Sequence, residues 1–345
     1  MNNETIRVYF DEDADLSYIE DKTIAIIGYG NQGRAWALNL RDSGVQNIIV
    51  GNIKDESWEV AEFDKFPVYS ISEAAEKADI LCILIPDEVH GEIYEAQIKD
   101  KLKEGKVLVF AHGYSITYGL IKPPSYVDVI MVAPRMIGKG VRETYKTGVG
   151  FPCFIAVHQD YSGKAKEIAL AISKGIGATK YGVLETTFDE ETFIDIYHEQ
   201  ITGIVGHLWL AAIDFIVKQG IPLEIALMEF YLSGETGETW KALGELGFFK
   251  GLRCASETAQ YGIMTRGPLI LTLELEKVFE KIYNDIVSGQ FAKELELERM
   301  TGKKFYYRWW KQKLEGPITK TEEKLFKILK RSPPSKPWKL QKKSV

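Results

Sequence analysis

Residues 23–33 read Thr23-Ile24-Ala25-Ile26-Ile27-Gly28-Tyr29-Gly30-Asn31-Gln32-Gly33. The apolar run 23–27 predicts a buried strand, and the spacing of apolar residues in 34–43 predicts a helix. Between them the glycines have the spacing GxGxxG. In this context Gly28 permits a tight turn, Gly30 lets the backbone approach a pyrophosphate, and Gly33 allows the helix to pack closely on the strand. We therefore interpret residues 28–33 as a dinucleotide-binding turn.

The region around this turn alternates short apolar runs with amphipathic stretches. Stretches such as Arg34–Ser43 and Ser72–Lys77 have the length that a right-handed crossover between parallel strands needs. The alternation predicts a doubly wound, mainly parallel α/β sheet of the Rossmann type, which we assign to residues 1–187. The expected strands are Thr23–Ile27, Asn47–Val50, Ile80–Ile85, Val107–Phe110, Val127–Val132 and Phe154–Val157.

The second half of the chain has a different pattern. After Thr187 the strand signals stop, and runs such as Glu190–Gln219 and Leu223–Leu232 repeat apolar residues at spacings of three and four, which predicts helices. Glycine and proline at 220–222, 247 and 267–268 divide this region into several helices. We assign residues 188–332 to a helical domain and residues 333–345, which carry three prolines and several lysines, to a basic flexible tail.

Composition excludes several classes of protein. The 45% hydrophobic and 27% charged residues are typical of a soluble folded chain, and a formal charge of −6 argues against a nucleic-acid partner. We find no stretch that is both long enough and apolar enough to span a bilayer, and the polar, acidic N-terminus does not resemble a signal peptide. The cysteines Cys82, Cys153 and Cys254 show neither CxxC spacing nor disulfide density. These features predict a cytoplasmic protein.

The segment after the second predicted strand determines which dinucleotide is bound. An acidic residue there hydrogen-bonds a ribose 2′-hydroxyl, whereas a basic residue or serine accommodates a 2′-phosphate. Asn52, Lys54 and Ser57 are the expected contacts, but Asp55 and Glu56 between them would repel a phosphate. NADP is slightly favoured, with NAD as the alternative.

Several further motifs occur in a fixed order and carry a resemblance to one family. They are Leu84-Ile85-Pro86-Asp87-Glu88, Phe110-Ala111-His112-Gly113-Tyr114, Val127–Arg135, Leu184–Phe188 and Asp195–Gln200. Together with the glycine turn they resemble ketol-acid reductoisomerase from about Thr23 to Ala292. The resemblance implies a Rossmann domain followed by a knotted helical domain. It also implies a homodimer or higher oligomer in which two subunits build each active site.

The same resemblance implies a reaction. The family binds two Mg²⁺ ions and NAD(P)H, and it converts a 2-acetohydroxy acid to a 2,3-dihydroxy acid by alkyl migration and hydride reduction, in valine and isoleucine synthesis. Matching positions assign His112, Arg135 and Ser256 to the catalytic site. They also extend the cofactor contacts to Asp87, Glu88, Val89, His90 and Gly138.

The metal-binding residues are predicted by helical spacing and by the resemblance. Asp195 and Glu199 are four residues apart in a helical run, so both carboxylates share one helix face, and oxygen ligands suit Mg²⁺. Without the family match, a solvated acidic face is the simpler interpretation. His112 follows the strand Val107–Phe110, at the edge where open α/β sheets bind ligands. An isolated Ser256 would by default be a helix cap.

Departures from the family pattern leave alternatives open. The family's second pair of glutamates falls on Tyr231 and Glu235 in one register, with Glu235 as metal ligand, and on Glu229 and Ser233 in another. Two glycines in 233–238 predict a kink or break there. Arg135 replaces a lysine, and the Gly-Pro-Gly turn that follows it in the family is not kept. Arg34 and Trp36 replace histidines. The alternatives are therefore a reductase without alkyl migration, or a dinucleotide-binding protein without catalysis.

Overall fold

The computed structural model describes residues 7–329 and 336–342. The chain divides into two compact units, Met1–Ile194 with Pro334–Val345, and Asp195–Pro333. The boundary at Ile194 lies inside a helix, because Phe188 and Glu191 in its first turns are buried in the sheet unit. The expected boundary between 332 and 333 falls outside the described residues.

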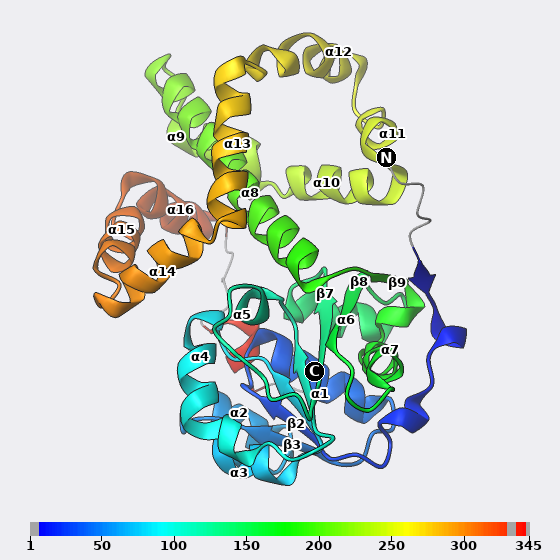
Figure 1. The fold of residues 1–345 in the computed structure, drawn as a ribbon. Helices are drawn as coiled ribbons and strands as arrows, with labels where there is room; N and C mark the ends of the chain where they lie inside the picture. The colour runs from blue at the N-terminus through cyan, green and yellow to red at the C-terminus, as the bar shows by residue number, and fades with distance from the viewer. Residues whose placement is uncertain (1–6, 330–335, 343–345) are drawn as a thin grey trace. The chain divides into compact units, whose positions relative to one another are not determined.

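The first unit is built on a nine-stranded sheet in the order β1-β9-β8-β7-β6-β5-β2-β3-β4 (Figure 1). The five central pairings from β4 to β7 are parallel, which confirms the predicted doubly wound sheet. The strands are β1 (Val8–Tyr9), β2 (Ile24–Ile27), β3 (Ile48–Gly51), β4 (Val68–Tyr69), β5 (Ile80–Ile83), β6 (Val107–Phe110), β7 (Asp128–Pro134), β8 (Cys153–Gln159) and β9 (Val183–Glu185).

Helices cover both faces of this sheet, because the central strands are apolar on both sides. Ile24 and Ile26 of β2 join one buried cluster with α1, α6 and α7, whereas Ala25 and Ile27 join a second cluster with α3. The helices of this unit are α1 (Asn31–Asp42), α2 (Glu56–Phe63), α3 (Ile71–Lys77), α4 (His90–Ile93), α5 (Tyr114–Thr117), α6 (Gly138–Thr147) and α7 (Ala165–Ile176).

Three strands were not predicted, and one runs against the expected direction. β1, β4 and β9 have two or three residues each, too few for a periodic signal. β8 pairs antiparallel with β7 but parallel with β9. Strand direction is not encoded in the alternation of apolar residues, so the sequence alone predicted only a mainly parallel sheet.

The second unit is helical, as predicted, and its breaks follow the glycines. Gly220 and Gly234 adopt left-handed backbone with φ of 99° and 87°, and each separates two helical segments. The helices are α8 (Phe188–Lys218), α9 (Leu223–Leu227), α10 (Glu235–Leu246), α11 (Phe248–Leu252), α12 (Glu257–Arg266), α13 (Leu273–Val287), α14 (Gln290–Met300), α15 (Lys304–Leu314) and α16 (Pro317–Ile328). Residues 228–232 form one π-helical stretch after α9.

Helix α8 corrects the expectation that no stretch is long and apolar enough to cross a bilayer. Its 31 residues reach a mean hydropathy of 1.5 in one window, of which 6% is buried. The sequence reasoning was wrong because it treated Glu190–Gln219 as amphipathic and overlooked the apolar central part. Length and composition alone are weak grounds for a membrane span, since core helices of soluble proteins pass the same test.

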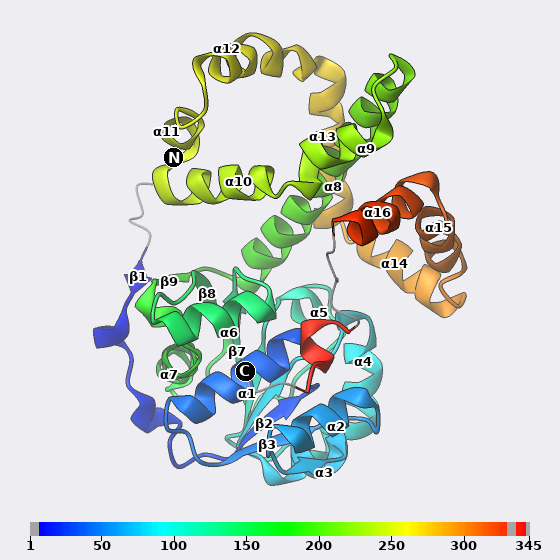
Figure 2. The same ribbon diagram turned by 180° about the vertical axis from the view of Figure 1, so that it is seen from behind.

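The C-terminal tail also differs from expectation. Its described part, residues 336–342, is not loose but contacts α1 and α2 of the first unit, with a short helical turn at Trp338–Leu340 (Figure 2). Arg34 donates hydrogen bonds to the carbonyl oxygens of Trp338 and Gln341. These contacts with the buried Arg34 hold the segment in place, although its prolines and lysines are typical of a flexible tail.

Candidate active site

The glycine turn has the geometry that close approach to a ligand requires. Gly28 has φ of 95°, and a Cβ there would lie within 2.9 Å of the β5 exit. A Cβ on Gly33 would lie 2.0 Å from the carbonyl oxygen of Gly28, so α1 packs directly on the turn. By contrast, no atom lies within 4 Å of a Cβ on Gly30. The turn is closed toward the protein and open at Gly30, as a pyrophosphate site needs to be.

Two side chains of the turn point into the protein. Tyr29 is fully buried, and its hydroxyl donates to Asp64 at 2.9 Å. Gln32 donates to the carbonyl oxygen of Met136 at 2.9 Å and accepts from the indole of Trp36. Gly138, at the start of α6, packs so tightly that a Cβ would lie 1.9 Å from the carbonyl oxygen of Asn31. These contacts shape the turn and leave its backbone open at Gly30.

Asn52, after β3, holds the segment expected to bind the ribose. Its side-chain oxygen accepts from the Tyr29 amide, and its side-chain nitrogen donates to Asp55 at 2.9 Å. Asp55 caps α2 by accepting from the Ser57 and Trp58 amides. Asp55 is therefore occupied as a helix cap. Lys54 is exposed and lies 5.9 Å from the Trp58 ring centroid.

The segment after β5 carries Asp87, Glu88, Val89 and His90. The first three form a short helical turn and are partly exposed, whereas His90 is 3% exposed. Its Nδ1 pairs with the Ser115 hydroxyl at 2.7 Å and its Nε2 with the carbonyl oxygen of Ile85 at 2.9 Å. Burial lowers the pKa of His90. His90 thus holds the exit of β5 against α5, and its expected contact with the cofactor stays a prediction.

Glu191, which the sequence reasoning did not single out, joins two of the predicted catalytic residues. Its fully buried carboxylate lies 2.9 Å from His112 Nδ1, accepts from the Gly113 amide at 2.8 Å, and pairs with Arg135 at 2.7 Å. His112 follows β6 and Arg135 follows β7, at the carboxyl edge of the sheet, where open α/β sheets bind ligands. The adjacent acids Asp189 and Glu190 are exposed, so the run resembled a solvated helix start.

Electrostatics hold Glu191 ionised. Burial raises the pKa of its carboxyl, but the hydrogen bond from His112, the charges of His112 and Arg135, and the Gly113 amide lower it by more. The net pKa lies below the ordinary glutamate value. A buried carboxylate is stable only when it is paired and hydrogen-bonded, and Glu191 meets both conditions.

Helix α8 places two predicted metal-binding residues in line with Glu191. Asp195 is four residues after Glu191 and Glu199 four residues further, so all three carboxylates lie along one helix face. Asp195 is partly buried and Glu199 is exposed. The carboxylate oxygens of Asp195 and Glu199 suit a hard divalent cation such as Mg²⁺, whereas that of Glu191 is engaged by His112 and Arg135. The spacing from Asp195 back to Glu191 was the sequence signal that could have revealed Glu191.

The remaining predicted residues lie in the second unit. Ser256 is the N-cap of α12 and accepts from the Ala259 amide, which is the default role of an isolated serine. Glu235 is exposed at the start of α10. Of the residues in the other register, Glu229 and Ser233 are exposed, whereas the hydroxyl of Tyr231 donates to Glu322 at 2.5 Å. Tyr231 therefore links the π-helical stretch 228–232 to α16.

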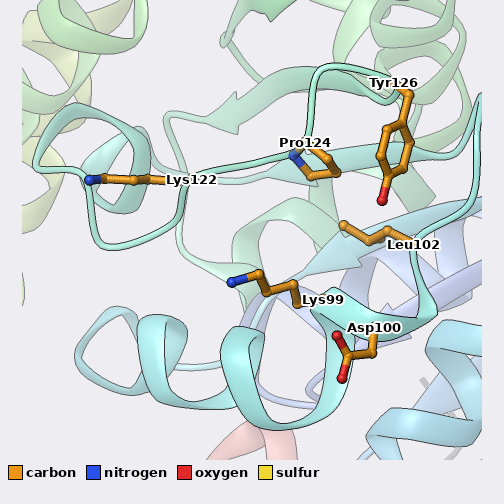
Figure 3. Close-up of a pocket in the computed structure, with 6 residues that line it drawn as sticks. All are labelled: Lys99, Asp100, Leu102, Lys122, Pro124 and Tyr126. Carbon is orange, nitrogen blue, oxygen red and sulfur yellow. The ribbon is translucent and has the colours of Figure 1, made fainter.

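One pocket of about 490 Å³ lies away from these residues (Figure 3). Its lining comes from the segments that precede β6 and β7, so it is at the amino ends of the strands. Ligands of open α/β sheets bind at the carboxyl ends, and we do not assign this pocket to the active site. It is lined by Lys99, Asp100, Leu102, Lys122, Pro124 and Tyr126.

Two family models together match most of the chain. The model described as "Acetohydroxy acid isomeroreductase, NADPH-binding domain" matches residues 18–182, and the model described as "Ketol-acid reductoisomerase, C-terminal domain" matches residues 188–331. The chain belongs to the ketol-acid reductoisomerase family.

Individual relatives agree with this assignment. A ketol-acid reductoisomerase (NADP(+)) of Pyrobaculum aerophilum is 43% identical over 94% of this chain and 98% of its own length. That of Methanocaldococcus jannaschii is 45% identical over 86% of this chain and 90% of its own length. Among solved structures, an NADH-preferring ketol-acid reductoisomerase from an uncultured archaeon is 38% identical with a TM-score of 0.89, covering 93% of this chain and 99% of that chain.

The structure explains two departures from the pattern expected of a ketol-acid reductoisomerase. Arg34 is fully buried and forms a salt bridge with Asp64 at 2.7 Å. Trp36 is fully buried in the core beneath the turn. Arg34 therefore fastens α1 to the end of α2, and Trp36 fills the core.

Proposed function

We propose that this protein is an active ketol-acid reductoisomerase. It converts 2-acetolactate and 2-aceto-2-hydroxybutyrate to 2,3-dihydroxy acids by alkyl migration followed by reduction. Family membership supports this function. The observation that carries it is the buried Glu191, which holds His112 and Arg135 at the sheet edge that also bears the glycine turn.

The cofactor in this proposal is NADPH, which supplies hydride to the migrated ketone. The turn 28–33 would hold its pyrophosphate, and Asn52, Lys54 and Ser57 would hold its ribose end. The open face at Gly30 and the engagement of Asp55 as a helix cap support this fit. Two of the relatives are named for NADP(+), and one neighbouring structure is described as NADH-preferring.

Mg²⁺ would be held by Asp195 and Glu199, with Glu235 or Glu229 completing the site. The metal supplies Lewis-acid polarisation of the substrate carbonyl and stabilises alkoxide charge. The chain's own contribution is to position charge. Glu191 fixes the ring of His112 and the guanidinium of Arg135, so that both present donors toward a substrate oxygen. In this proposal Ser256 adds a substrate contact.

A homodimer or higher oligomer is part of the proposal. The second unit exposes several large apolar side chains, among them Phe249 at 80%, Leu269 at 73% and Leu273 at 71%. Large apolar side chains exposed in such number favour a protein interface, and a partner that covered them would bring its own carboxylates to the site. The three cysteines are free thiols, which supports a cytoplasmic location.

The proposal is tested by supplying two substrates to the purified full-length protein with Mg²⁺ and NADPH. Turnover of both 2-acetolactate and the migrated intermediate, 3-hydroxy-3-methyl-2-ketobutyrate, supports the isomeroreductase. Turnover of the intermediate alone overturns the migration step and leaves a reductase. Cofactor binding without turnover of either substrate overturns the enzymatic function.

The variant Asp195→Asn tests the metal site. It removes one anionic ligand, so we expect Mg²⁺ affinity to fall by at least about tenfold and alkyl migration to be lost. Isothermal titration with Mg²⁺ measures the first effect directly. The control is Asp214→Asn on the same helix, where an exposed aspartate pairs with Lys218. Unchanged Mg²⁺ affinity in Asp195→Asn would remove this residue from the metal site.

A further inference from the structure

The segment 336–342 returns from the end of the chain to the nucleotide-binding helices of the first unit. Arg34 on α1 is the anchor. Its fully buried guanidinium lies 5.4 Å from the Trp338 ring centroid and donates to the carbonyl oxygens of Trp338 and Gln341 at 3.1 and 2.7 Å. A buried arginine with an ion-pair partner and two backbone acceptors is a built site, since an unpaired guanidinium would be costly there.

This anchor connects directly to the glycine turn. Asp64 receives two hydrogen bonds from Arg34 and one from the Tyr29 hydroxyl, which belongs to the turn itself. Burial and the neighbouring Asp64 raise the pKa of Tyr29, so its phenol stays protonated and remains a donor. The C-terminal segment and the turn therefore share one hydrogen-bonded junction.

The second connection is electrostatic and lies on α2. Lys336 pairs with Glu56 at 2.8 Å, and Lys342 pairs with Glu59 at 2.9 Å. Glu56 is adjacent to Ser57, one of the residues expected to bind a 2′-phosphate. Lys342, with a smaller contribution from Lys336, holds the pKa of Glu59 below its usual range. Both ion pairs lie on the helix that follows the ribose-binding segment.

The charges of residues 54–59 are balanced only when Lys336 and Lys342 are counted with them. Lys54, Asp55, Glu56 and Glu59 carry a net charge of −2, which disfavours a doubly charged phosphate. Lys336 and Lys342 bring the sum to zero. An unphosphorylated ribose is far less sensitive to this difference, because its hydroxyl carries no charge.

We propose that the C-terminal segment 336–342 is part of the cofactor site and sets the preference for NADPH over NADH, by neutralising the acidic start of α2. The inference rests on the dinucleotide binding in the proposed function. It assigns a specificity role to residues some 280 positions away in sequence from the helix that they contact.

A purely structural role would give a different result. If the segment only stabilised the first unit, its loss would weaken both dinucleotides equally. If it acts through charge, Lys336→Gln with Lys342→Gln keeps the Arg34 and Trp338 contacts and changes only the ratio of the two affinities. Exposed charges are screened by salt, so the change in ratio is expected to shrink from low to high ionic strength.

The experiment measures dissociation constants of full-length protein for NADPH and NADH by nicotinamide fluorescence. In Lys336→Gln/Lys342→Gln we expect affinity for NADPH to fall about 3- to 10-fold and affinity for NADH to change less than about 2-fold. Adding Glu56→Gln and Glu59→Gln to that variant removes the acidic charge and should restore the ratio. The matched control is Lys324→Gln, which breaks a similar lysine–glutamate pair in the second unit.

An unchanged ratio, or an equal loss for both dinucleotides, would overturn the specificity role while leaving the proposed function intact. Failure of the wild-type protein to bind either dinucleotide would instead overturn the proposed function together with this inference. Failure of the four-residue variant to restore the ratio would show that charge balance is not the cause, and would also overturn the inference.

Discussion

The two units of this chain differ in how far they bury their apolar side chains. The first unit buries two large clusters, one on each face of its sheet, so that its central strands have no solvent-exposed side. The second unit buries only five residues in the single cluster found among its described residues, and exposes side chains such as Phe249 and Leu273 almost completely. The comparison shows that the first unit buries most of its large apolar side chains, whereas the second leaves many of its own exposed, as the proposed oligomer would need.

The chemistry of the proposed enzyme is divided along the same line. Nucleotide binding and the cluster around Glu191 belong to the first unit. The predicted metal ligands Asp195, Glu199 and Glu235 all belong to the second unit. Metal affinity should therefore depend on association of the chain, whereas dinucleotide binding should not.

The largest effect is expected at the buried carboxylate of the first unit. Glu191→Gln removes the charge that His112 and Arg135 share. We expect about 3 kcal/mol of lost stability, at the low end for a broken buried ion pair because both partners keep some solvent contact. Activity should fall at least about 100-fold. Urea unfolding and steady-state kinetics measure the two effects, and Asp189→Asn at an exposed position should change neither.

The same residue predicts a pH dependence. The pKa of Glu191 is lower in the folded protein than its ordinary value of 4.5. Its contribution to stability is therefore fully present above pH 4.5 and is lost as pH falls through the folded pKa. Between neutral pH and pH 3 the wild-type protein should lose more stability than Glu191→Gln. Parallel stability curves for the two proteins would contradict a paired, ionised Glu191.

A loss of stability of similar size, but without the loss of the buried charge, is expected in the glycine turn, where two positions differ in the space around them. Gly33→Ala forces a Cβ against the Gly28 carbonyl and should cost about 3 kcal/mol. Gly30→Ala meets no atom, and should cost only about 1 kcal/mol because alanine is a poor helix cap. Yet it should weaken NADPH binding at least about tenfold, by filling the open face. Thermal unfolding and cofactor titration separate these effects, and equal stability losses would contradict the geometry.

Substitutions of the exposed apolar residues should have the smallest effect on folding. They nevertheless test the difference between the two units most directly. Phe249→Glu with Leu273→Glu should leave the first unit folded and able to bind NADPH, but shift the sedimentation of the protein toward a monomer. Val149→Glu, at a position 59% exposed in the first unit, is the control. A wild-type protein that sediments as a monomer would show that the second unit is stable without a partner.

The sequence predicted the architecture of the first unit, but not the individual contacts between distant residues. The central strands and the glycine turn carry strong local signals, and residues 107–110 form the predicted strand with the same bounds. Glu191 was not predicted as a site residue, because an acidic run with solvated neighbours is typical of an exposed helix face. The contact of Arg34 with Gln341 joins residues 307 positions apart, and no local pattern encodes such a contact. A single sequence also gives no means to choose between the two registers around Gly234.

Because segment 336–342 belongs to the first unit, the entire second unit is an insertion within it. During synthesis the backbone acceptors of Arg34 are translated only after the whole second unit, so these hydrogen bonds form last. Until then the guanidinium lacks these two acceptors, and the junction beneath the glycine turn is incomplete. A chain that stops short of Trp338 would thus form its sheet while lacking the last contact that fastens the nucleotide-binding helices, which couples maturation of this site to completion of the polypeptide.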